Sequence, residues 1–454
     1  MLRRSAYERL ERWRAQPGRR ALLIDGARQV GKTYLVRAFA RAHYDLLVEI
    51  NFIDQPEAKA IFEGSLNAAT VIPLLSAFAG RPLEPGRTLV FLDEIQACPR
   101  ARTAIKFLVD DGRFDYIESG SLLGVSYCEP PSLPVGYESV LRLYPLTFEE
   151  FCWALDVQPE VLDLARECFE RQCVVPEPVH GRLMRLFSYY LAIGGMPAVV
   201  ARFAETRDVA RALEVQQDIL ALYRMDIARY ARNKAHVRAI FDAIPAELDK
   251  QNKRFRLSDL AKSARTERYE SDFIWLADAG VGLPCFNVSE LVAPLRLNVK
   301  HSMFKLFLCD TGLLTAQLAD GVQFKILQGQ LDVNWGAVLE NAFAQMLTAN
   351  GFDALYYERA KHGEIDFVVQ KGGKVIPIEA KSGRIFRAHA SLDSVLRVRE
   401  WGLDLAYVFC RENVAVEVKL PDGRDDPATI AYLPWYMMAF VKPEGLPESL
   451  VVEL

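Results

Sequence analysis

Short apolar runs and longer amphipathic stretches alternate along the first 150 residues. The apolar runs predict buried strands, and the stretches between them have apolar positions at helical spacing. Strands separated by helices pair in parallel, so we expect an α/β fold with one sheet covered on both faces. The expected strands are residues 21–24, 46–52, 88–92, 116–119 and 140–143, with helices that include 33–42 and 102–109.

The pattern then becomes almost purely helical over residues 148–231. The proline-rich stretch 174–180 interrupts it, and so does the segment 194–197, Gly-Gly-Met-Pro, which must end a helix. We therefore expect a separate helical region.

Residues 234–318 change character again, from helices to extended segments. A helix is expected from 256, with Ser258 as a candidate cap, then a turn at 264–266. A second helix places Tyr269, Phe273 and Leu276 on one face. Extended segments at 281–288 and 304–308 follow, and this order of helix, turn, helix and hairpin predicts a winged helix.

The last part of the chain begins with a helix and continues as strands, which indicates another α/β domain. The helix is expected over 338–348 and the strands over 354–357, 365–369, 375–379 and 406–409.

Composition describes an ordinary folded protein, with 454 residues, 51% apolar and 25% charged. The net charge of −4 gives no global attraction to nucleic acid or anionic membranes, so any such contact must be local. We expect no signal peptide and no membrane span, since no apolar stretch is long enough. The eight cysteines form no CxxC pair and predict neither zinc nor disulfides, so we expect a cytoplasmic protein.

One segment directly after the first expected strand has a specific chemical pattern. It is Gly26-Ala27-Arg28-Gln29-Val30-Gly31-Lys32-Thr33, which matches G-x-x-x-x-G-K-[ST]. A glycine loop between a strand and a helix N-terminus can surround phosphates with backbone N–H groups. Lys32 would then reach the outer phosphates and the Thr33 hydroxyl would bind magnesium, which predicts ATP and Mg²⁺ as ligands.

The strand expected at 88–92 ends in two carboxylates, Asp93 and Glu94. Asp93 is predicted to hold magnesium, and Glu94, on the other side of the strand, to orient and deprotonate the attacking water. The next strand ends in the hydroxyl residues Ser119 and Ser121. In ATPases with a catalytic glutamate this strand lies between the other two and senses the γ-phosphate. An equal alternative is that these serines only cap the next helix.

A second group of charged residues lies near the end of the chain. Glu379 and Lys381 share one face of a strand, and a hairpin over Gly372-Gly373 would bring Asp366 beside Glu379. Glu340, on the preceding helix, adds a third carboxylate. Such acids with a lysine can bind magnesium and activate water against a phosphodiester, but a solvated strand face with a Glu/Lys pair stays an alternative.

The chain resembles the bacterial and archaeal AAA-type ATP-binding proteins whose carboxyl-terminal half is a domain of unknown function of the PD-(D/E)xK, or restriction-endonuclease-like, type. The matching segments are 26–33, 92–96, 120–121, 144–151, 194–197, 304–306, 310–314, 364–366 and 379–381. The resemblance implies a P-loop ATPase core over 1–150, a helical lid over 151–232, a winged helix over 233–325 and a nuclease-like domain over 326–454. It also implies a switch in which the nucleotide state controls the attached domains.

The chain departs from the family at one position. The family often has Gly-Arg shortly before its Tyr-Pro-Leu motif, whereas Gly136 is followed here by Tyr137. Arg142 is the nearest substitute, and we assign no arginine finger.

Contact with nucleic acid has two candidate regions. The second helix of the predicted winged helix, at 265–272, has two arginines but three acids, and acids weaken phosphate contact. The tract 250–256 is a better basic patch. A winged helix that only packs domains together is an equal alternative.

Three functions are therefore compared. The first is an ATP-hydrolysing switch coupled to a nuclease acting on DNA. The second is an ATP-dependent DNA- or protein-binding regulator with a catalytically silent nuclease fold. The third is a small-molecule kinase, against which a water-activating Glu94 argues.

Overall fold

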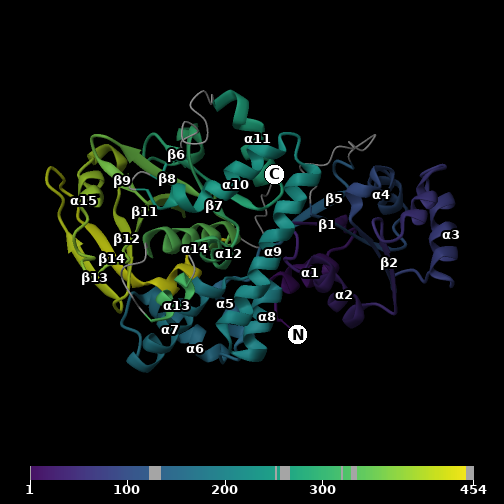
Figure 1. The fold of residues 1–454 in the computed structure, drawn as a ribbon, viewed down its shortest axis with the longest axis horizontal. Helices are drawn as coiled ribbons and strands as arrows, with labels where there is room; N and C mark the ends of the chain where they lie inside the picture. The colour runs from purple at the N-terminus through teal and green to yellow at the C-terminus, as the bar shows by residue number, and fades with distance from the viewer. Residues whose placement is uncertain are drawn as a thin grey trace, which may run out of the picture. The chain divides into compact units, whose positions relative to one another are not determined.

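The computed structural model describes residues 2–121, 134–250, 253–255, 266–318, 321–328 and 335–445, without the side chains of 266–270 and 322 (Figure 1). Its contacts divide the chain into two compact units. The first unit comprises Met1–Pro145, Arg229–Arg232 and Ile274–Val281, and the second comprises Leu146–Ala228, Asn233–Phe273 and Gly282–Leu454.

The first unit contains a five-stranded parallel sheet in the order β2-β3-β4-β1-β5, as the alternating pattern predicts. β4 lies between β1 and β3, which is the place expected for the strand that ends in the two serines. The strands are β1 (Ala21–Asp25), β2 (Leu46–Asn51), β3 (Thr88–Asp93), β4 (Asp115–Gly120) and β5 (Glu138–Arg142).

Helices cover both faces of this sheet. Leu22 and Ile24 of β1 pack in a core with α1 and α2, whereas Leu23 points to the opposite core with α3 and α4. Alternate residues thus feed two apolar layers, which explains why the central strands read as continuous apolar runs. The helices are α1 (Ala6–Ala15), α2 (Lys32–His43), α3 (Ala68–Ala79) and α4 (Pro99–Asp111), with 3-10 turns η1 (Pro56–Phe62) and η2 (Ile95–Ala97).

The second unit opens with the helices predicted for residues 148–231. Thr147 and Glu150 form a capping box at the first of them. Gly194, with φ of 76°, ends one helix, and Pro197 begins the next, as the Gly-Gly-Met-Pro segment predicts. The helices are α5 (Phe148–Ala154), α6 (Pro159–Arg171), α7 (Glu177–Ile193), α8 (Pro197–Thr206), α9 (Val209–Tyr230) and α10 (Lys234–Leu248).

The predicted hairpin is present, but its sheet is larger than a two-stranded wing. β6 (Gly282–Val288) pairs antiparallel with β7 (Val299–Leu308), and β6 also pairs parallel with β8 (Leu355–Arg359). The resulting sheet, β7-β6-β8-β9, thus runs across the predicted boundary at 325–326. The helix that precedes the hairpin is α11 (Thr266–Asp278). The helix and turn predicted at 256–265 lie outside the described residues, so the winged helix and the four-domain division stay predictions.

The carboxyl-terminal region contains the predicted helix and strands, and its second sheet is mixed. β10 and β11 form the hairpin expected over Gly372-Gly373, in a sheet of order β10-β11-β12-β14-β13. Sequence reasoning missed β13 and β14. The elements are α12 (Thr311–Gln317), α13 (Val322–Leu327), α14 (Trp335–Ala349), β9 (Gly363–Ile365), β10 (Phe367–Lys371), β11 (Lys374–Ala380), α15 (Ala390–Leu396), β12 (Leu405–Cys410), β13 (Ala415–Lys419) and β14 (Ala428–Pro434). The 3-10 helices of this unit are η5 (Leu295–Asn298), η6 (Arg399–Trp401) and η7 (Trp435–Phe440).

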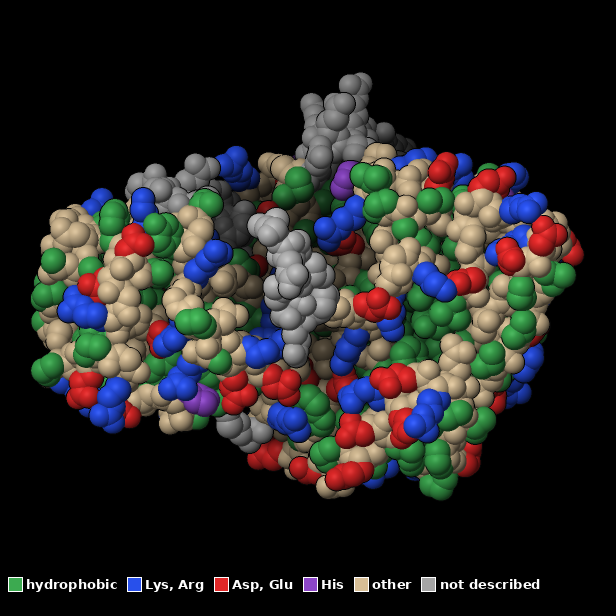
Figure 2. Space-filling view, turned by 180° about the vertical axis from the view of Figure 1, so that it is seen from behind, with side chains coloured by type: hydrophobic (Ala, Val, Ile, Leu, Met, Phe, Trp, Pro, Cys, Tyr) green, Lys and Arg blue, Asp and Glu red, His purple; other side chains and the backbone are tan. Residues whose placement is uncertain are grey.

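The cysteines and the surface charges can both be located in the structure. The cysteines that the structure describes are free thiols, and Cys128 lies outside the described residues. Figure 2 shows basic and acidic side chains interspersed over one face of the molecule. Within the described ranges, none of the helices combines the length and the apolar character that crossing a bilayer requires.

Candidate nucleotide-binding site

The glycine loop lies between β1 and α2, where the sequence predicts it. Gly26 has φ of 144° and its Cα faces the backbone carbonyl of Leu143, so a side chain at this position has no room. Gly31, with φ of 92°, is the residue before α2, and Lys32 is the first helical residue. The loop is therefore a strand-to-helix turn whose backbone approaches a helix N-terminus, where anions are favoured.

The ammonium group of Lys32 lies across the loop. Its Nζ donates to the carbonyl oxygens of Gly26 and Ala27, at 2.8 Å each. Burial lowers the pKa of Lys32 to about 8, and the carboxylates of Glu94, Asp25 and Asp93 oppose that fall. The group is thus a cation already held beside the loop amides, which is the place from which it can contact a bound phosphate.

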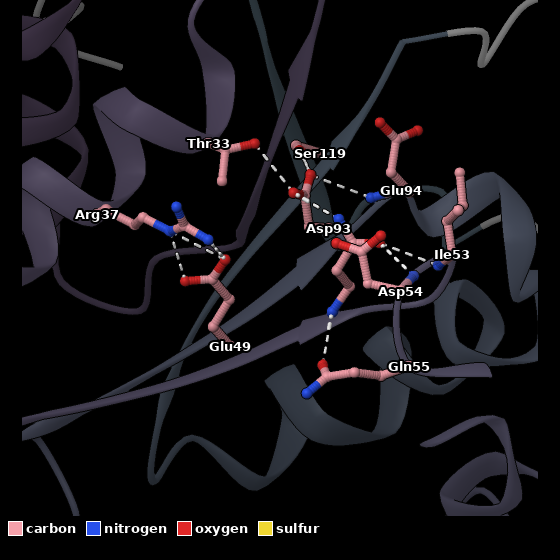
Figure 3. Close-up of polar contacts among 10 residues, drawn as sticks. Thr33, Arg37, Glu49, Ile53, Asp54, Gln55, Asp93, Glu94 and Ser119 are labelled. Carbon is pink, nitrogen blue, oxygen red and sulfur yellow. Dashed lines mark hydrogen bonds and ion pairs between the residues drawn. The ribbon is translucent and has the colours of Figure 1, made fainter. Parts of the chain in front are cut away.

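Asp93, at the end of β3, is held by polar groups from three neighbouring strands and helices (Figure 3). Thr33 Oγ1 donates to Asp93 Oδ2 at 2.9 Å, and Asn51 Nδ2 donates to the same oxygen at 3.3 Å. The Ser119 hydroxyl donates to Asp93 Oδ1. The predicted pair of Thr33 and Asp93 is therefore brought together in space, and Ser119 joins it.

These groups fit a magnesium ion. A threonine hydroxyl and a carboxylate are oxygen ligands of the kind that Mg²⁺ prefers, and both lie beside a loop suited to phosphates. Thr33 and Asp93 would hold the ion, and Ser119 and Asn51 would fix the orientation of the carboxylate.

The side chain of Glu94 points away from Asp93 (Figure 3). Glu94 has φ of 53°, a left-handed conformation that turns the chain directly after β3. Its Oε2 accepts hydrogen bonds from Gln96 Nε2 and from the Ser121 hydroxyl, the latter at 3.3 Å. One acid thus faces the Thr33 hydroxyl while the next faces a different set of donors.

Sequence reasoning missed Asn51 and Gln96. Asn51 ends β2 and lies in register with Asp93 of the neighbouring strand, so the shared sheet edge is the signal that points to it. Gln96 lies two residues after Glu94, which is a spacing that a tight turn brings into contact. Gln96 is the last residue of the matching segment 92–96 but was given no role there, and Asn51 belongs to no matching segment.

The predicted carboxyl-terminal residues also come together. Asp366 Oδ2 accepts from the backbone N–H of Ala380 at 2.8 Å, beside Glu379. Burial, together with the carboxylates of Glu340 and Glu379, raises the pKa of Asp366 to about 7, although Lys305 opposes the rise. Asp366 thus lies beside Glu379, as the hairpin predicts, and Glu340 is close enough to Asp366 to raise its pKa.

Two lysines that the sequence did not single out for this site neutralise these acids. Glu340 pairs with Lys253 and, at 3.5 Å, with Lys305, whose Nζ also pairs with Glu364. Glu379 pairs with Lys381. Burial alone would lower the pKa of Lys305, which is 1% exposed, but the carboxylates of Glu340 and Glu364 outweigh it and raise that pKa.

This arrangement does not fit a divalent metal ion. Over the residues that the structure describes, no three His, Cys, Asp or Glu side chains are placed to hold one. The carboxylates of Glu340, Glu364 and Glu379 already face ammonium groups, which a cation would have to displace. Lys253 belongs to the tract predicted as a basic patch, and it is turned towards Glu340 instead of lying open to solvent.

Comparison with protein families identifies the class of the first part of the chain. Residues 18–152 match the family described as an AAA domain. Residues 184–323 and 335–422 match two domains of unknown function, DUF8612 and DUF4143. The AAA-type identification is thereby confirmed: the chain has an ATPase-like AAA domain with a P-loop. The restriction-endonuclease-like type of the last domain stays a prediction.

Similar solved structures are distant from this chain. The Walker-type ATPase of Pyrococcus abyssi is 17% identical, with a TM-score of 0.41, over 70% of this chain and 96% of that one. The ORC1 protein of Aeropyrum pernix in complex with DNA is 14% identical, with a TM-score of 0.28, over 72% and 92%. A single-substitution variant of RuvB from Thermotoga maritima is 14% identical, with a TM-score of 0.27, over 61% and 84%. None of the curated proteins matches the chain.

Proposed function

We propose that this chain is an ATP-hydrolysing switch protein. The observation that carries the proposal is the separation of the two acids after β3. Asp93 is fixed by Thr33 and Ser119, whereas the carboxylate of Glu94 points away towards Gln96 and Ser121. One acid is thus placed to bind a cation and the other to accept a proton from water.

The binding roles follow from the loop. The backbone N–H groups of residues 26–33 would surround the phosphates, because glycine at 26 and 31 lets the backbone approach an anion. Lys32 would exchange its two carbonyl partners for phosphate oxygens. Magnesium, when bound by Thr33 and Asp93, supplies charge neutralisation at the phosphate oxygens.

The hydrolytic role falls to Glu94. A carboxylate at this place can orient a water molecule and take its proton as the water attacks the terminal phosphate. Ser121 donates to Glu94 and accepts from Arg28 Nε at 3.3 Å, so it links the loop to the base. This arrangement favours Ser121 as part of the site over a serine that only caps a helix.

A kinase is the less favoured function. Transfer to a small molecule requires that water be kept from the phosphate, whereas Glu94 is a base suited to activating water. Phosphate release in the absence of any added acceptor distinguishes the two.

For the carboxyl-terminal domain, the ion pairs favour the alternative of a catalytically silent fold that binds DNA or protein. Lys305 and Lys253 neutralise Glu340, and Lys381 neutralises Glu379. Carboxylates that are already neutralised by ammonium groups offer less charge to a metal ion. Cleavage of plasmid DNA in magnesium or manganese that is lost in Asp366→Ala would overturn this choice and favour the nuclease.

The experiment that tests the proposed function is the release of phosphate from ATP by the full chain in magnesium. We expect turnover in the wild type and a fall of about 100-fold in Lys32→Ala, because the variant loses a preorganised cation at the phosphates. Lys106→Ala, at an exposed position of α4, is the matched control. A wild-type chain without turnover contradicts the proposal.

The same assay with and without DNA separates the two kinds of partner. If DNA is the ligand that the switch senses, turnover changes when DNA is added, and the effect weakens as salt rises, because phosphate contacts release counterions. Turnover that is indifferent to DNA would point to a protein partner instead.

A further inference from the structure

A distant segment of the chain contacts the P-loop within the first unit. Residues Ile274–Val281, the end of α11 and the turn after it, belong to the same compact unit as the loop. Gly280 lies against the backbone of Ala27, the second residue of the loop. A Cβ at Gly280 would lie 2.8 Å from Ala27 N and 3.2 Å from its Cα. Glycine at this position therefore allows a backbone-to-backbone contact that no other residue fits.

A charged side chain joins the same two segments. Arg142, at the end of β5, lies in register with Asp25, the residue before the loop. Arg142 Nε is 3.9 Å from Asp25 Oδ2, and Arg142 Nη2 donates to the carbonyl oxygen of Ala277 at 3.0 Å. Ala277 lies in the last turn of α11, and its carbonyl oxygen also accepts from the backbone N–H of Gly280 at 3.0 Å, so the carbonyl joins Arg142 to the turn at a helix end that favours a cation.

We infer that Gly280 and Arg142 are positioning residues for nucleotide binding, which rests on the proposed ATPase function. The turn at 279–280 contacts the loop at Ala27. Arg142 connects that turn to the end of β1, directly before the loop. The N–H groups of the loop must all point at one phosphate site, so a displacement of Ala27 weakens binding. Arg142 is thus not assigned as an arginine finger. It affects nucleotide binding by positioning the loop.

The contact between Gly280 and Ala27 also links the nucleotide loop to the chain that follows the turn. Val281 follows this turn directly, and β6 begins at Gly282. Coupling between two events is reciprocal, so a nucleotide that fixes Ala27 also restrains residues 277–281. We expect amide hydrogen exchange of these residues to slow when ATP binds, which gives a readout besides turnover.

The decisive variant is Gly280→Ala, with Gly112→Ala as its matched control. Both glycines follow a helix in the first unit with nearly equal φ, +72° and +71°, so both substitutions introduce the same backbone strain. A Cβ at Gly112 meets nothing within 4 Å, whereas at Gly280 it meets the loop. We expect Gly280→Ala to raise the Kd for ATP, measured by calorimetry, by about tenfold or more relative to Gly112→Ala.

Arg142→Ala provides a second test that introduces no steric clash, at a side chain that is 43% exposed. We expect KM for ATP to rise severalfold while kcat changes little, since Thr33, Asp93 and Glu94 are untouched. Arg142→Lys, which keeps the charge beside Asp25, should restore part of the loss. A role in general stability alone would not produce this separation of KM from kcat.

The outcomes distinguish the inference from the function on which it rests. If the wild type binds no ATP, the proposed function fails. If the wild type binds ATP and Gly280→Ala binds it as well as Gly112→Ala does, the positioning role of Gly280 is wrong. If Gly280→Ala does not fold, as seen by circular dichroism, an unchanged KM in Arg142→Ala overturns the inference.

Discussion

The hydroxyl of Thr33 lies 2.9 Å from a carboxylate oxygen of Asp93, although 60 residues separate them in the sequence. Parallel strands place their carboxyl ends at one edge of a sheet, so β1, followed by the loop, and β3 deliver these groups to the same edge. The other oxygen, Oδ1, accepts from Ser119 and from the backbone N–H of Glu94, at 3.1 Å for the latter. Each Asp93 oxygen thus has its own donors, and the carboxylate has a fixed orientation.

The two acids after β3 have separable roles, which Glu94→Gln tests. We expect this variant to bind ATP as the wild type does, because Lys32, Thr33 and Asp93 keep their contacts. Turnover should fall by about 10²- to 10⁴-fold, the usual contribution of a general base. Calorimetric titration with ATP and phosphate release measure the two effects. A variant that loses binding and turnover together would contradict the assignment.

Much of this site follows from the sequence, because its chemistry is tied to local chain geometry. The loop needs glycines between a strand and a helix, and residues 26–33 are contiguous. The order of β3, β4 and β1 follows from the class of ATPase that a terminal Asp-Glu pair indicates. Asn51 could not be predicted as a site residue because its role comes from the pairing of β2 with β3, which places it beside Asp93. No pattern within its own strand indicates that role.

The carboxyl-terminal cluster shows why the rest was harder to predict. The hairpin of β10 and β11 was expected, since glycines at 372 and 373 with apolar flanks form a local signal. Lys305 lies on β7, 35 positions before Glu340 in the numbering, and pairs with it only through tertiary packing. A charged lysine inside the apolar run 304–308 conflicts with the pattern of a buried strand. This conflict was the signal in the sequence that Lys305 has a buried partner.

Ser119 and Ser121 contact different acids, so their alanine variants should differ. Ser119→Ala removes a donor from Asp93 and should mainly raise KM for Mg-ATP, whereas Ser121→Ala removes a donor from Glu94 and should mainly lower kcat. A single hydrogen bond contributes about 1 kcal/mol, so each effect should be roughly fivefold. Steady-state kinetics at several magnesium concentrations measure both. Equal effects of the two variants on KM would count against the separation.

His180 gives a pH dependence of stability. Burial lowers the pKa of His180, which is 8% exposed and lies 3.3 Å from the Tyr436 hydroxyl, while Glu177 opposes the fall. Below the ordinary histidine pKa of about 6.5, the unfolded chain binds a proton that the folded chain does not. The unfolding free energy therefore falls as pH drops through that range, by at most about 1.4 kcal/mol per pH unit for this group.

Urea unfolding at pH 7 and pH 5.5 measures the His180 effect. We expect the loss of stability between the two values to be smaller in His180→Gln than in the wild type. His301→Gln, at an exposed position, should leave the loss unchanged. If His180→Gln loses as much stability as the wild type on acidification, the prediction that His180 contributes to the pH dependence is wrong.

The lysine at the centre of the carboxyl-terminal cluster should matter for stability. Lys305→Met leaves Glu364 without its ammonium partner and Glu340 with Lys253 alone, and breaking a buried pair costs about 3–5 kcal/mol of unfolding free energy. Lys374→Met, which breaks the exposed pair with Asp404, should cost far less than Lys305→Met, because water screens an exposed ion pair. Chemical denaturation measures both variants.

The same variant tests whether the ammonium groups keep a metal ion out of the cluster. With Lys305 removed, the carboxylates of Glu340, Glu364 and Asp366, which all interact with its ammonium group, lose compensating charge, so Lys305→Met should bind Mn²⁺ more tightly than the wild type does. Adding Mn²⁺ should then recover part of the lost stability, and EDTA should reverse that recovery. Glu340→Gln in the same background removes a repelling charge and should also recover stability, without metal. Tight Mn²⁺ binding by the wild type, with no gain in Lys305→Met, would show instead that the lysines leave room for a metal and would favour the nuclease.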